Sequence, residues 1–543
     1  MWDDAPCWSG WGPADAPIRS LPETAAPLLR GLGVDPERRR APVELDAVRL
    51  AEPGLPEGVR DRLARVAQVH DDRLARVLHA AGKSYFDLVR LRAGDGIPAP
   101  DAVVVAADGA VVEEVLRICT GAGVAVVPFG GGTSVVGGVE PLRGDFGGVV
   151  SLDLGGMGAL LDADERSLVA VLGAGMRGPA VERALGERGL TLGHFPQSWE
   201  YASVGGMVAT RSAGQASTGY GRIDELVRGV DLVAPAGRLD LAVRTRNAAG
   251  PELRELDAGS EGVLGVITQA TLAVRPRPAV RRYEGWSFPS FRDGIEAFRA
   301  VEQEHVAPDL ARLSDEAETA VNLAMAGGGR AEQALGWYLR LRRHKGGCVA
   351  IVGWEGTELD VGRRHAASEA VLRRWDGIPL GARPGVLWRR GRYDAPYLRD
   401  ALLDHGVLAE TLETATSWTR LHELHDAVAG ALHDALAAHE TPPVVLCHVS
   451  HLYPVGASLY FTVLARQQEG EEVGQWRTAK DAACQAILRH GGTITHHHAI
   501  GRDHAAYLEA EIGPTGITLL RAAKAELDPA GILNPGKLLP GVS

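Results

Sequence analysis

Residues Pro128–Gly138 read PFGGGTSVVGG and directly follow an apolar run, Val124–Pro128, that predicts a β-strand. The Gly-Lys-Ser/Thr ending of a P-loop is absent, so this is not the common nucleoside-triphosphate loop. Three adjacent glycines allow successive backbone N–H groups to point at one anion, and Thr133 and Ser134 add hydroxyl donors. The segment therefore favours a pyrophosphate site, with a flexible turn as the alternative.

Predicted strands and helices alternate on both sides of this loop. Apolar runs and helical spacing predict strands at Asp101–Ala106, Gly148–Leu154 and Arg166–Leu172, and helices at Gly109–Ala122 and Pro179–Arg188. The alternation continues to about Pro278 and predicts an α/β or α+β domain over residues 98–278.

Two further segments of small and hydroxyl-bearing residues follow. Pro196–Gly206 reads PQSWEYASVGG and continues through TRSAG at Thr210–Gly214, and Gly259–Thr268 reads GSEGVLGVIT. A large planar ligand could lie against such a backbone, because few side chains obstruct it. For either segment alone, ordinary turns remain the alternative interpretation.

Gly173–Gly178 reads GAGMRG and matches the GxGxxG pattern between a predicted strand and a predicted helix. A dinucleotide fingerprint of the Rossmann type also needs an acidic residue about twenty positions further on. The corresponding stretch, Leu190–His194, contains no acid. A tight strand-to-helix turn is therefore the preferred interpretation.

The rest of the chain predicts two more regions. Residues 1–97 read as a helical N-terminal region that contains an amphipathic stretch, Val59–Ala81. Residues 279–543 alternate helices with predicted strands at Cys348–Trp354, Val444–His451 and Ser458–Leu464, and they end with a helix and turn-rich tail at Gly516–Lys537. We expect a second α+β domain there.

Thr495–Gly501 reads THHHAIG, and its β-branched neighbours predict an extended segment. On a strand, His496 and His498 would share one face and His497 would point away. Two imidazoles on one face could move protons or bind an anion. A metal would need a third ligand, and no His or carboxylate lies at helical spacing, so we expect no metal. Chance surface placement is the alternative.

Two other residues, Tyr460 and Arg399, suggest a function only when their neighbours are considered. Tyr460, in a predicted strand–turn–strand at Ser450–Phe461, would alone be a core aromatic residue. Near cations its pKa would fall and its phenol could act as an acid or base. Arg399 would alone be a surface arginine, but its guanidinium could also bind a phosphate.

Bulk composition excludes several classes of protein. The chain has 543 residues, a net charge of −12 and no long basic stretch, which argues against nucleic-acid binding. No apolar run is long enough to cross a bilayer, and Met1–Gly10 does not read as a secretory signal. The five cysteines are scattered without a CxxC pair. We expect a cytoplasmic homodimer and leave peripheral membrane contact open.

The glycine loop and the two later small-residue segments together resemble the FAD-binding domain of the vanillyl-alcohol oxidase and para-cresol methylhydroxylase (PCMH) superfamily. The resemblance implies an α+β fold, with a PCMH-type domain of two α+β subdomains and an α+β cap domain around a central antiparallel sheet. It also implies a bound FAD. The loop contains no His or Cys and His194 lies outside it, so we expect non-covalent FAD. The implied cofactor-binding residues are Pro128, Gly130, Gly131, Gly132, Thr133, Ser134, Val135, Gln197, Ser198, Tyr201, Ser203, Gly206, Thr210, Ser212, Ala213, Glu261, Gly265, Val266 and Ile267.

Four motifs across nearly the whole chain resemble the alkyldihydroxyacetonephosphate synthase family. They are WSGWG at Trp8–Gly12, YLRD at Tyr397–Asp400 with the later Glu413-Thr414 and Trp418, YPVGASLYF at Tyr453–Phe461, and HHHAIG at His496–Gly501. The resemblance implies that Tyr460 is the catalytic tyrosine and that His496, His497 and His498 form an essential tract. It further implies that Arg312 is needed for activity and that Arg399 binds the substrate phosphate.

The implied reaction exchanges the acyl chain of acyl-dihydroxyacetone phosphate for a fatty alcohol in ether-lipid synthesis. In that family the reaction passes through a flavin N5 adduct without net redox change, and Tyr460 with the histidine tract would remove the C1 proton. The chain departs from the family pattern at Thr495, at Ala499, where the family has Gly, and at Thr462-Val463.

Two other classes of function remain as alternatives. The first is an FAD-dependent dehydrogenase or oxidase of a 2-hydroxy acid. Related enzymes of that type carry a Gly-His-x-x-Asp-Gly-Asn-x-His metal motif around the segment that His451–Tyr460 occupies here, and the Asp and second His are absent. The second is a binding module without enzymatic activity, which a chain purified without a yellow chromophore would favour.

Overall fold

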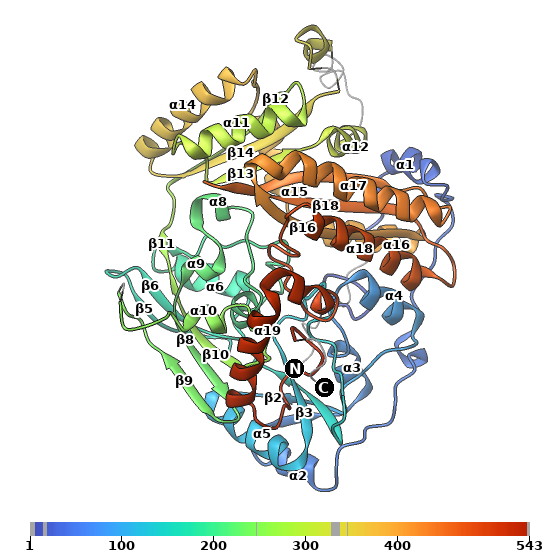
Figure 1. The fold of residues 1–543 in the computed structure, drawn as a ribbon, viewed down its shortest axis with the longest axis vertical. Helices are drawn as coiled ribbons and strands as arrows, with labels where there is room; N and C mark the ends of the chain where they lie inside the picture. Colours follow the sequence, from blue (N-terminus) through green and yellow to red (C-terminus); the bar gives the residue numbers. More distant parts are fainter. Residues whose placement is uncertain (1–5, 15–18, 246, 327–336, 345, 540–543) are drawn as a thin grey trace.

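The computed structural model describes residues 6–14, 19–245, 247–326, 337–344 and 346–539. Within them two smaller sheets lie in the lower half of Figure 1, and a larger sheet covered by helices lies in the upper half. The chain is an α+β protein whose largest sheet is antiparallel, as the sequence predicts. No helix in the described ranges is sufficiently long and apolar to traverse a bilayer.

The first sheet has the order β1-β2-β4-β3 and is parallel except at β1. Its strands are β1 (Gln68–His70), β2 (Ala102–Val105), β3 (Val124–Phe129) and β4 (Gly148–Asp153). Helix α5 spans Gly109–Ala122 as predicted, because Asp108 Oδ1 accepts the N–H groups of Ala110 and Val111 and Gly123 ends the helix in a left-handed conformation.

The predicted amphipathic helix over Val59–Ala81 is wrong. The structure contains α2 (Val59–Ala64) and α3 (Arg73–Leu78), and strand β1 separates them. β1 pairs antiparallel with β2, so sheet hydrogen bonds with a distant segment override the local helical pattern.

The second sheet is antiparallel with the order β5-β6-β10-β8-β9. Its strands are β5 (Leu160–Asp164), β6 (Val169–Gly173), β8 (Val227–Ala234), β9 (Gly237–Leu241) and β10 (Val266–Ala273). Helices α6 (Gly178–Gly186) and α7 (Val204–Ala209) accompany them, and β7 (Leu190–Thr191) pairs with β11 (Arg275–Pro276). Both small sheets share one apolar core, which makes them two subdomains of one unit.

The large sheet has the order β15-β12-β14-β13-β17-β18-β16 and its own apolar core. Its strands are β12 (Val280–Phe288), β13 (Leu310–Ser314), β14 (Cys348–Gly356), β15 (Ile378–Gly381), β16 (Val407–Ser417), β17 (Val444–Tyr453) and β18 (Gly456–Arg466). Helices α11 (Phe291–Gln303), α14 (Glu358–Arg374), α17 (Leu421–Ala438) and α18 (Glu472–Arg489) lie on it (Figure 1).

Shorter helices complete the description. They are α1 (Ala26–Gly31), α4 (Tyr85–Ala93), α8 (Ser217–Tyr220), α9 (Ile223–Leu226), α10 (Arg254–Asp257), α12 (Glu316–Ala326), α15 (Ala382–Gly391), α16 (Ala395–Asp404) and the 3₁₀ turns η1 (Glu23–Ala25), η2 (Leu45–Ala47), η3 (Trp418–Arg420) and η4 (Ala505–Tyr507).

The C-terminal segment returns to the first sheet. Helix α19 (Leu508–Leu527) bends where Gly513 adopts φ 76° and Pro514 follows it. Beyond the helix, Leu533 forms a parallel bridge with Val126, and Asn534 Nδ2 donates to the carbonyl oxygens of Gly138 and Glu261. The end of the chain therefore braces the glycine loop.

Candidate functional site

The three glycine-rich and small-residue segments meet in space. A Cβ added to Gly130 would lie 2.0 Å from Ser203 Oγ, and one added to Gly131 would lie 1.9 Å from the Tyr201 carbonyl oxygen. From the other side, a Cβ on Gly262 would lie 2.9 Å from Pro128. Gly131 therefore packs directly on backbone, and Gly130 and Gly262 pack on the side chains of Ser203 and Pro128.

A cavity of about 790 Å³ opens at the carboxyl ends of the parallel strands β2, β4 and β3. Its wall includes Gly130–Gly132, the Gly155–Gly156 turn, Gly175–Arg177 and the side chain of Lys83. The carboxyl end of a parallel sheet is where α/β folds bind ligands. The glycine backbone and the Arg177 guanidinium form a donor set that suits the pyrophosphate of a dinucleotide.

The GxGxxG segment is a tight turn, as predicted. Gly173 and Gly175 press on the carbonyl oxygens of Met157 and Leu154, where added Cβ atoms would come within 2.2 Å and 1.9 Å. The same turn forms part of the cavity wall.

Several predicted cofactor residues use their polar groups within the protein. Gln197 Nε2 donates to the Arg392 carbonyl at 2.8 Å, and Thr210 Oγ1 donates to the Gly206 carbonyl at 2.8 Å. Ser212 Oγ lies 2.7 Å from His194 Nε2. Val266 and Ile267 face the apolar core, and Gly265 packs on Leu232.

The other predicted cofactor residues lie in the glycine loop or in the segment around α7 that packs against it. They are Pro128, Thr133, Ser134 and Val135 in the glycine loop and the bend after it, and Ser198, Tyr201, Ser203, Gly206 and Ala213 around α7.

Glu261 connects the small-residue segment Gly259–Thr268, one of the predicted cofactor segments, to the loop of the histidine tract. Its carboxylate accepts the N–H groups of Ile500 (2.8 Å) and Gly501 (2.6 Å), and burial raises its pKa to about 7. The backbone of Glu261 is used as well, because its N–H donates to the Ala209 carbonyl at 3.0 Å and its carbonyl accepts Asn534 Nδ2 at 2.7 Å.

The histidine tract is not a strand, contrary to the prediction. Residues 496–498 form an irregular bend, and adjacent rings lie close, with centroids 5.1 Å apart for His496–His497 and 4.8 Å for His497–His498. His497 therefore does not point away from its neighbours. The cause is Glu413, whose carboxylate accepts the backbone N–H groups of all three residues and so replaces a strand ladder.

Tyr460 lies among these rings. It is the cross-strand partner of Glu413 on β16 and of His448 on β17. Its ring stacks on His448 with a centroid distance of 4.9 Å and on His497 at 6.0 Å, and it meets His498 edge-on at 5.7 Å. The structure thus places the predicted tyrosine against the predicted histidine tract.

The expected lowering of the Tyr460 pKa is wrong. Burial raises the pKa of Tyr460 to about 12, and Glu410 and Glu413 add to the rise, while the hydrogen bond with Thr411 and the charge of Arg312 oppose it too weakly. Burial also lowers the pKa of His496, His497 and His498. At neutral pH the site therefore presents a protonated phenol and neutral imidazoles.

Arg312 is linked to Tyr460 through two side chains, Glu318 and His448. Its Nη2 donates to Glu318 Oε1 at 2.8 Å, and His448 Nδ1 donates to the same oxygen at 3.1 Å. Although burial favours the neutral acid, His448 and Arg312 hold the pKa of Glu318 at about 2. Arg312 thus orients the imidazole that stacks on Tyr460.

Arg399 lies beside Lys83 and the N-terminal motif, WSGWG at Trp8–Gly12. Arg399 Nη1 donates to the Lys83 carbonyl at 2.6 Å, and Lys83 Nζ donates to the Cys7 carbonyl at 2.9 Å. Asp400, next to Arg399, accepts the Trp11 N–H. Arg399 Nη2 also pairs with Asp400 Oδ1 at 3.4 Å. Among the described residues, no hydrogen-bond partner reaches the buried Arg399 Nε, which leaves this one N–H of the guanidinium for an anion.

Glu413, His496 and His497 together supply ligand atoms within 4.8 Å of one another, so a third potential metal ligand exists that the sequence did not reveal. His496 Nδ1 and His497 Nδ1 are 2.9 Å apart, which is a hydrogen-bond distance. The Glu413 oxygens already face N–H donors. This geometry suits shared protons better than a cation.

Local patterns did not single out Glu318, His448 or Lys83, and the motifs that contain Glu413 and His451 gave these two residues no role in the site. His451 Nε2 donates to the Gly214 carbonyl at 2.9 Å, and the His451 ring lies 5.0 Å from that of His496. Most of these side chains join the site through strand pairing, such as Glu413 opposite Tyr460. A known strand register could have revealed Glu413, His448 and His451, whereas Glu318 lies on helix α12 and Lys83 outside the strands.

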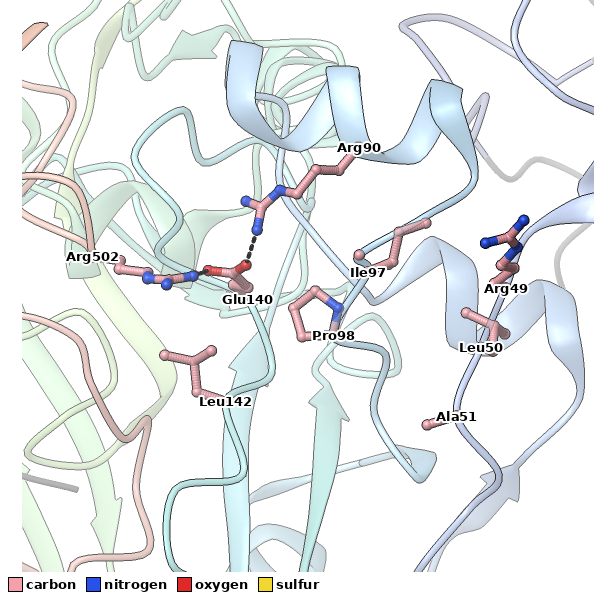
Figure 2. Close-up of a pocket in the computed structure, with 10 residues that line it drawn as sticks. Arg49, Leu50, Ala51, Arg90, Ile97, Pro98, Glu140, Leu142 and Arg502 are labelled. Atoms are coloured by element: carbon pink, nitrogen blue, oxygen red, sulfur yellow. Dashed lines mark hydrogen bonds and ion pairs between the residues drawn. The ribbon is translucent and has the colours of Figure 1, made fainter. Parts of the chain in front are cut away.

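A second cavity, of about 570 Å³, lies behind the glycine loop. Figure 2 shows Arg90 and Arg502 reaching Glu140 from opposite sides, at 2.8 Å and 2.6 Å. Arg502 directly follows the histidine loop, and its N–H donates to the Val136 carbonyl at 2.9 Å. These contacts fix the loop against the glycine segment.

Comparisons with known proteins agree with this arrangement. Residues 100–241 match the family model "FAD binding domain", and residues 277–538 match "FAD linked oxidases, C-terminal domain". An alkyldihydroxyacetonephosphate synthase of Dictyostelium discoideum is 32% identical over 98% of this chain and 86% of the relative. A solved alkyldihydroxyacetonephosphate synthase structure is 29% identical, with a TM-score of 0.84, over 97% of this chain and 98% of that one. A p-cresol methylhydroxylase structure, 15% identical with a TM-score of 0.66 over 91% of this chain and 99% of that one, shares the fold.

Proposed function

The chain belongs to the alkyldihydroxyacetonephosphate synthase family and is an FAD-dependent enzyme, and we propose that it exchanges the acyl chain of acyl-dihydroxyacetone phosphate for a fatty alcohol. The observation that carries the proposal is the contact between Tyr460 and the histidine tract that Glu413 holds. This group lies next to a loop that Glu261 joins to the cofactor segments.

FAD would be held by the backbone of Gly130–Gly132 and the hydroxyls of Thr133 and Ser134, with non-covalent binding as expected. When bound, the flavin supplies an electrophilic ring that takes up an electron pair reversibly, so no net redox change is needed. The convergence of Gly130 with Ser203 and of Gly131 with Tyr201 supports this placement.

Arg399 would bind the substrate phosphate. Its unpartnered Nε supports the role, and the Lys83 ammonium adds a second positive charge nearby. Burial lowers the pKa of Lys83 to about 8, which still leaves the amine largely protonated at pH 7.

The proton that leaves C1 of the substrate would go to a neutral imidazole of His497 or His498. Tyr460, which keeps its proton, would donate a hydrogen bond to the substrate rather than act as the base. This assignment revises the sequence-based expectation, because burial of the phenol outweighs the neighbouring cation.

A turnover assay tests the proposal directly. The purified holoenzyme is mixed with palmitoyl-dihydroxyacetone phosphate and hexadecanol, and the alkyl product and released palmitate are measured. We expect both in equal amounts and no bleaching of the flavin spectrum by 2-hydroxy acids. Bleaching by a hydroxy acid without alkyl product would favour the dehydrogenase alternative and reject the synthase.

We include peripheral membrane contact and a homodimer in the proposal. Trp337 and Leu341 are each 66% exposed, and Arg340, Arg342 and Arg343 lie beside them in the chain. Exposed aromatic and aliphatic groups among arginines are typical of segments that lie at a lipid surface. Such contact would suit a substrate that carries a long acyl chain.

A further inference from the structure

Glu413 gathers four donors from consecutive residues. Its Oε1 accepts the Thr495 hydroxyl at 2.7 Å and the N–H groups of His497 and His498 at 3.0 Å and 2.7 Å. Its Oε2 accepts the His496 N–H. The side chain is 1% exposed. A carboxylate with this many donors stays ionised, and although burial opposes ionisation, the surrounding histidines and Thr495 hold its pKa well below the usual value.

The loop that carries the histidines has no secondary structure to hold it. Residues 495–500 form neither a helix nor a strand, and Ala499 adopts φ 75° immediately after the tract. A buried backbone without ladder partners must satisfy its N–H groups elsewhere. Glu413 supplies that acceptor from the neighbouring strand β16, which is rigid because it pairs along its whole length with β18.

The placement of the backbone determines the hydrogen bonds of the rings. Tyr453 Oη lies 2.6 Å from His496 Nε2, and His496 Nδ1 lies 2.9 Å from His497 Nδ1. Two Nδ1 atoms at that separation share one proton, so each ring keeps a defined tautomer. Because His496 is bonded at both nitrogens, its partner His497 has Nε2 left for other contacts, beside the ring of Tyr460.

We infer that Glu413 is a positioning residue, which fixes the backbone of Thr495–His498 so that His496 and His497 share a proton and His497 lies against Tyr460. The inference rests on the proposed function for its catalytic purpose. It differs from a metal site at the same residues, in which the two nitrogens would separate to coordinate an ion.

The test compares the Glu413→Gln holoenzyme with wild type. An amide presents an NH₂ group where a carboxylate oxygen accepts donors, so at least one N–H of the loop loses its acceptor. With histidine-selective ¹⁵N labelling, the wild type should show a hydrogen-bonded imidazole N–H signal that His497→Asn removes. We expect Glu413→Gln to lose or shift this signal while it retains the FAD spectrum.

Steady-state kinetics then separates a loss in kcat from a loss in substrate affinity. We expect kcat to fall about 100-fold with KM unchanged, because a displaced imidazole costs orientation and not affinity. Glu284→Gln is the matched control: Glu284 is a buried carboxylate on β12 that bonds Trp286 and His365, and its variant should keep the N–H signal and kcat. Thr495→Val is the substitute test if Glu413→Gln fails to fold. It removes only one of the four donors to Glu413, and we expect kcat to fall by about tenfold.

The outcomes separate this inference from the proposed function. If the wild type makes no alkyl product, the proposed function fails, and the N–H signal still decides whether Glu413 aligns the histidines. An unchanged N–H signal in Glu413→Gln would overturn the inference. So would stoichiometric zinc or another transition metal in the purified wild type that is lost in Glu413→Gln.

Discussion

The Tyr460 ring is enclosed by imidazoles on one side and faces Glu413 across the strand pair. Because its pKa is raised to about 12, the phenol is a hydrogen-bond donor at neutral pH. Its hydroxyl, rather than its charge, is therefore the group that the proposed reaction uses.

We predict that Tyr460→Phe lowers kcat by about 100- to 1,000-fold, the range for loss of one hydrogen-bond donor that stabilises the transition state. The FAD absorbance spectrum should not change, because the ring stays in its stack. Tyr507→Phe is the control, since its hydroxyl donates to Asp481 away from the histidine tract. Full activity of Tyr460→Phe in the synthase assay would show that the phenol takes no part.

Ala499 is strained by its own conformation. A φ of 75° suits glycine, and an L residue there costs about 1 to 2 kcal/mol. We predict that Ala499→Gly stabilises the protein by about 1 kcal/mol in denaturant unfolding, after allowance for the more flexible unfolded chain. Ala522→Gly, on the exposed side of α19, should instead destabilise by about 1 kcal/mol. A loss of stability in Ala499→Gly would mean that this φ is not strained.

At the scale of elements, the strand β3 and its glycine loop form the base of the proposed cofactor site. The loop lies so close to Tyr201 and Ser203 that even one methyl group has no space. Because the obstacles at Gly131 are backbone atoms, the neighbours cannot move aside without shifting α7.

We predict that Gly131→Ala is purified with little or no bound FAD, measured as the ratio of absorbance at flavin and protein wavelengths. Gly121→Ala provides the comparison, because Gly121 lies in α5 with nothing near its added Cβ. That variant should bind FAD fully and gain up to about 1 kcal/mol of stability. Equal flavin content in both variants would argue against a cofactor role for the loop.

Local patterns located most of the elements but not all of them. Helix α5 and strand β3 lie where helical spacing and an apolar run place them, because amphipathic helices and buried strands leave local signatures. The stretch Val59–Ala81 and the histidine tract differ from prediction, since β1 takes its partner from β2 and the tract takes its acceptor from Glu413. Both deviations arise from contacts with distant segments.

At the scale of the whole molecule, three regions contribute to one site. The N-terminal motif meets α16 at Asp400, the glycine loop meets the C-terminal tail at Asn534, and the large sheet supplies Tyr460. Burial between these regions leaves several histidines neutral. Burial lowers the pKa of His451 and His504 to about 4 and that of His194 to about 3.

We predict a pH-dependent effect of His504→Asn on global unfolding. The folded pKa of His504 is about 4 and its usual value is 6.5, so the unfolded chain binds the extra proton in this window. Its stabilising contribution is complete above pH 6.5 and is lost as the pH falls toward 4. As the pH falls below 6.5, the free energy of unfolding of the variant should therefore rise relative to that of the wild type by about 1.4 kcal/mol per pH unit.

Denaturant unfolding at pH 7.5 and pH 5 would measure this difference. Asp87, Asp257 and Glu261 act in the opposite direction, because burial raises their pKa to about 6, 7 and 7, so wild type alone would not isolate His504. The exposed His433→Asn variant should show the same offset from wild type at both pH values. A constant offset for His504→Asn would contradict the prediction.

Residue order alone was enough to locate most strands and the glycine loop, because these depend on local periodicity, and its motifs indicated the α+β class and the family through their resemblance to known proteins. It did not reveal that Glu413 shapes the histidine tract, that Glu318 and His448 link Arg312 to Tyr460, or that the Tyr460 pKa rises. Those properties depend on burial and on partners that lie far away in the chain, such as Glu413 and His497, which come together only when the strands of the large sheet pair.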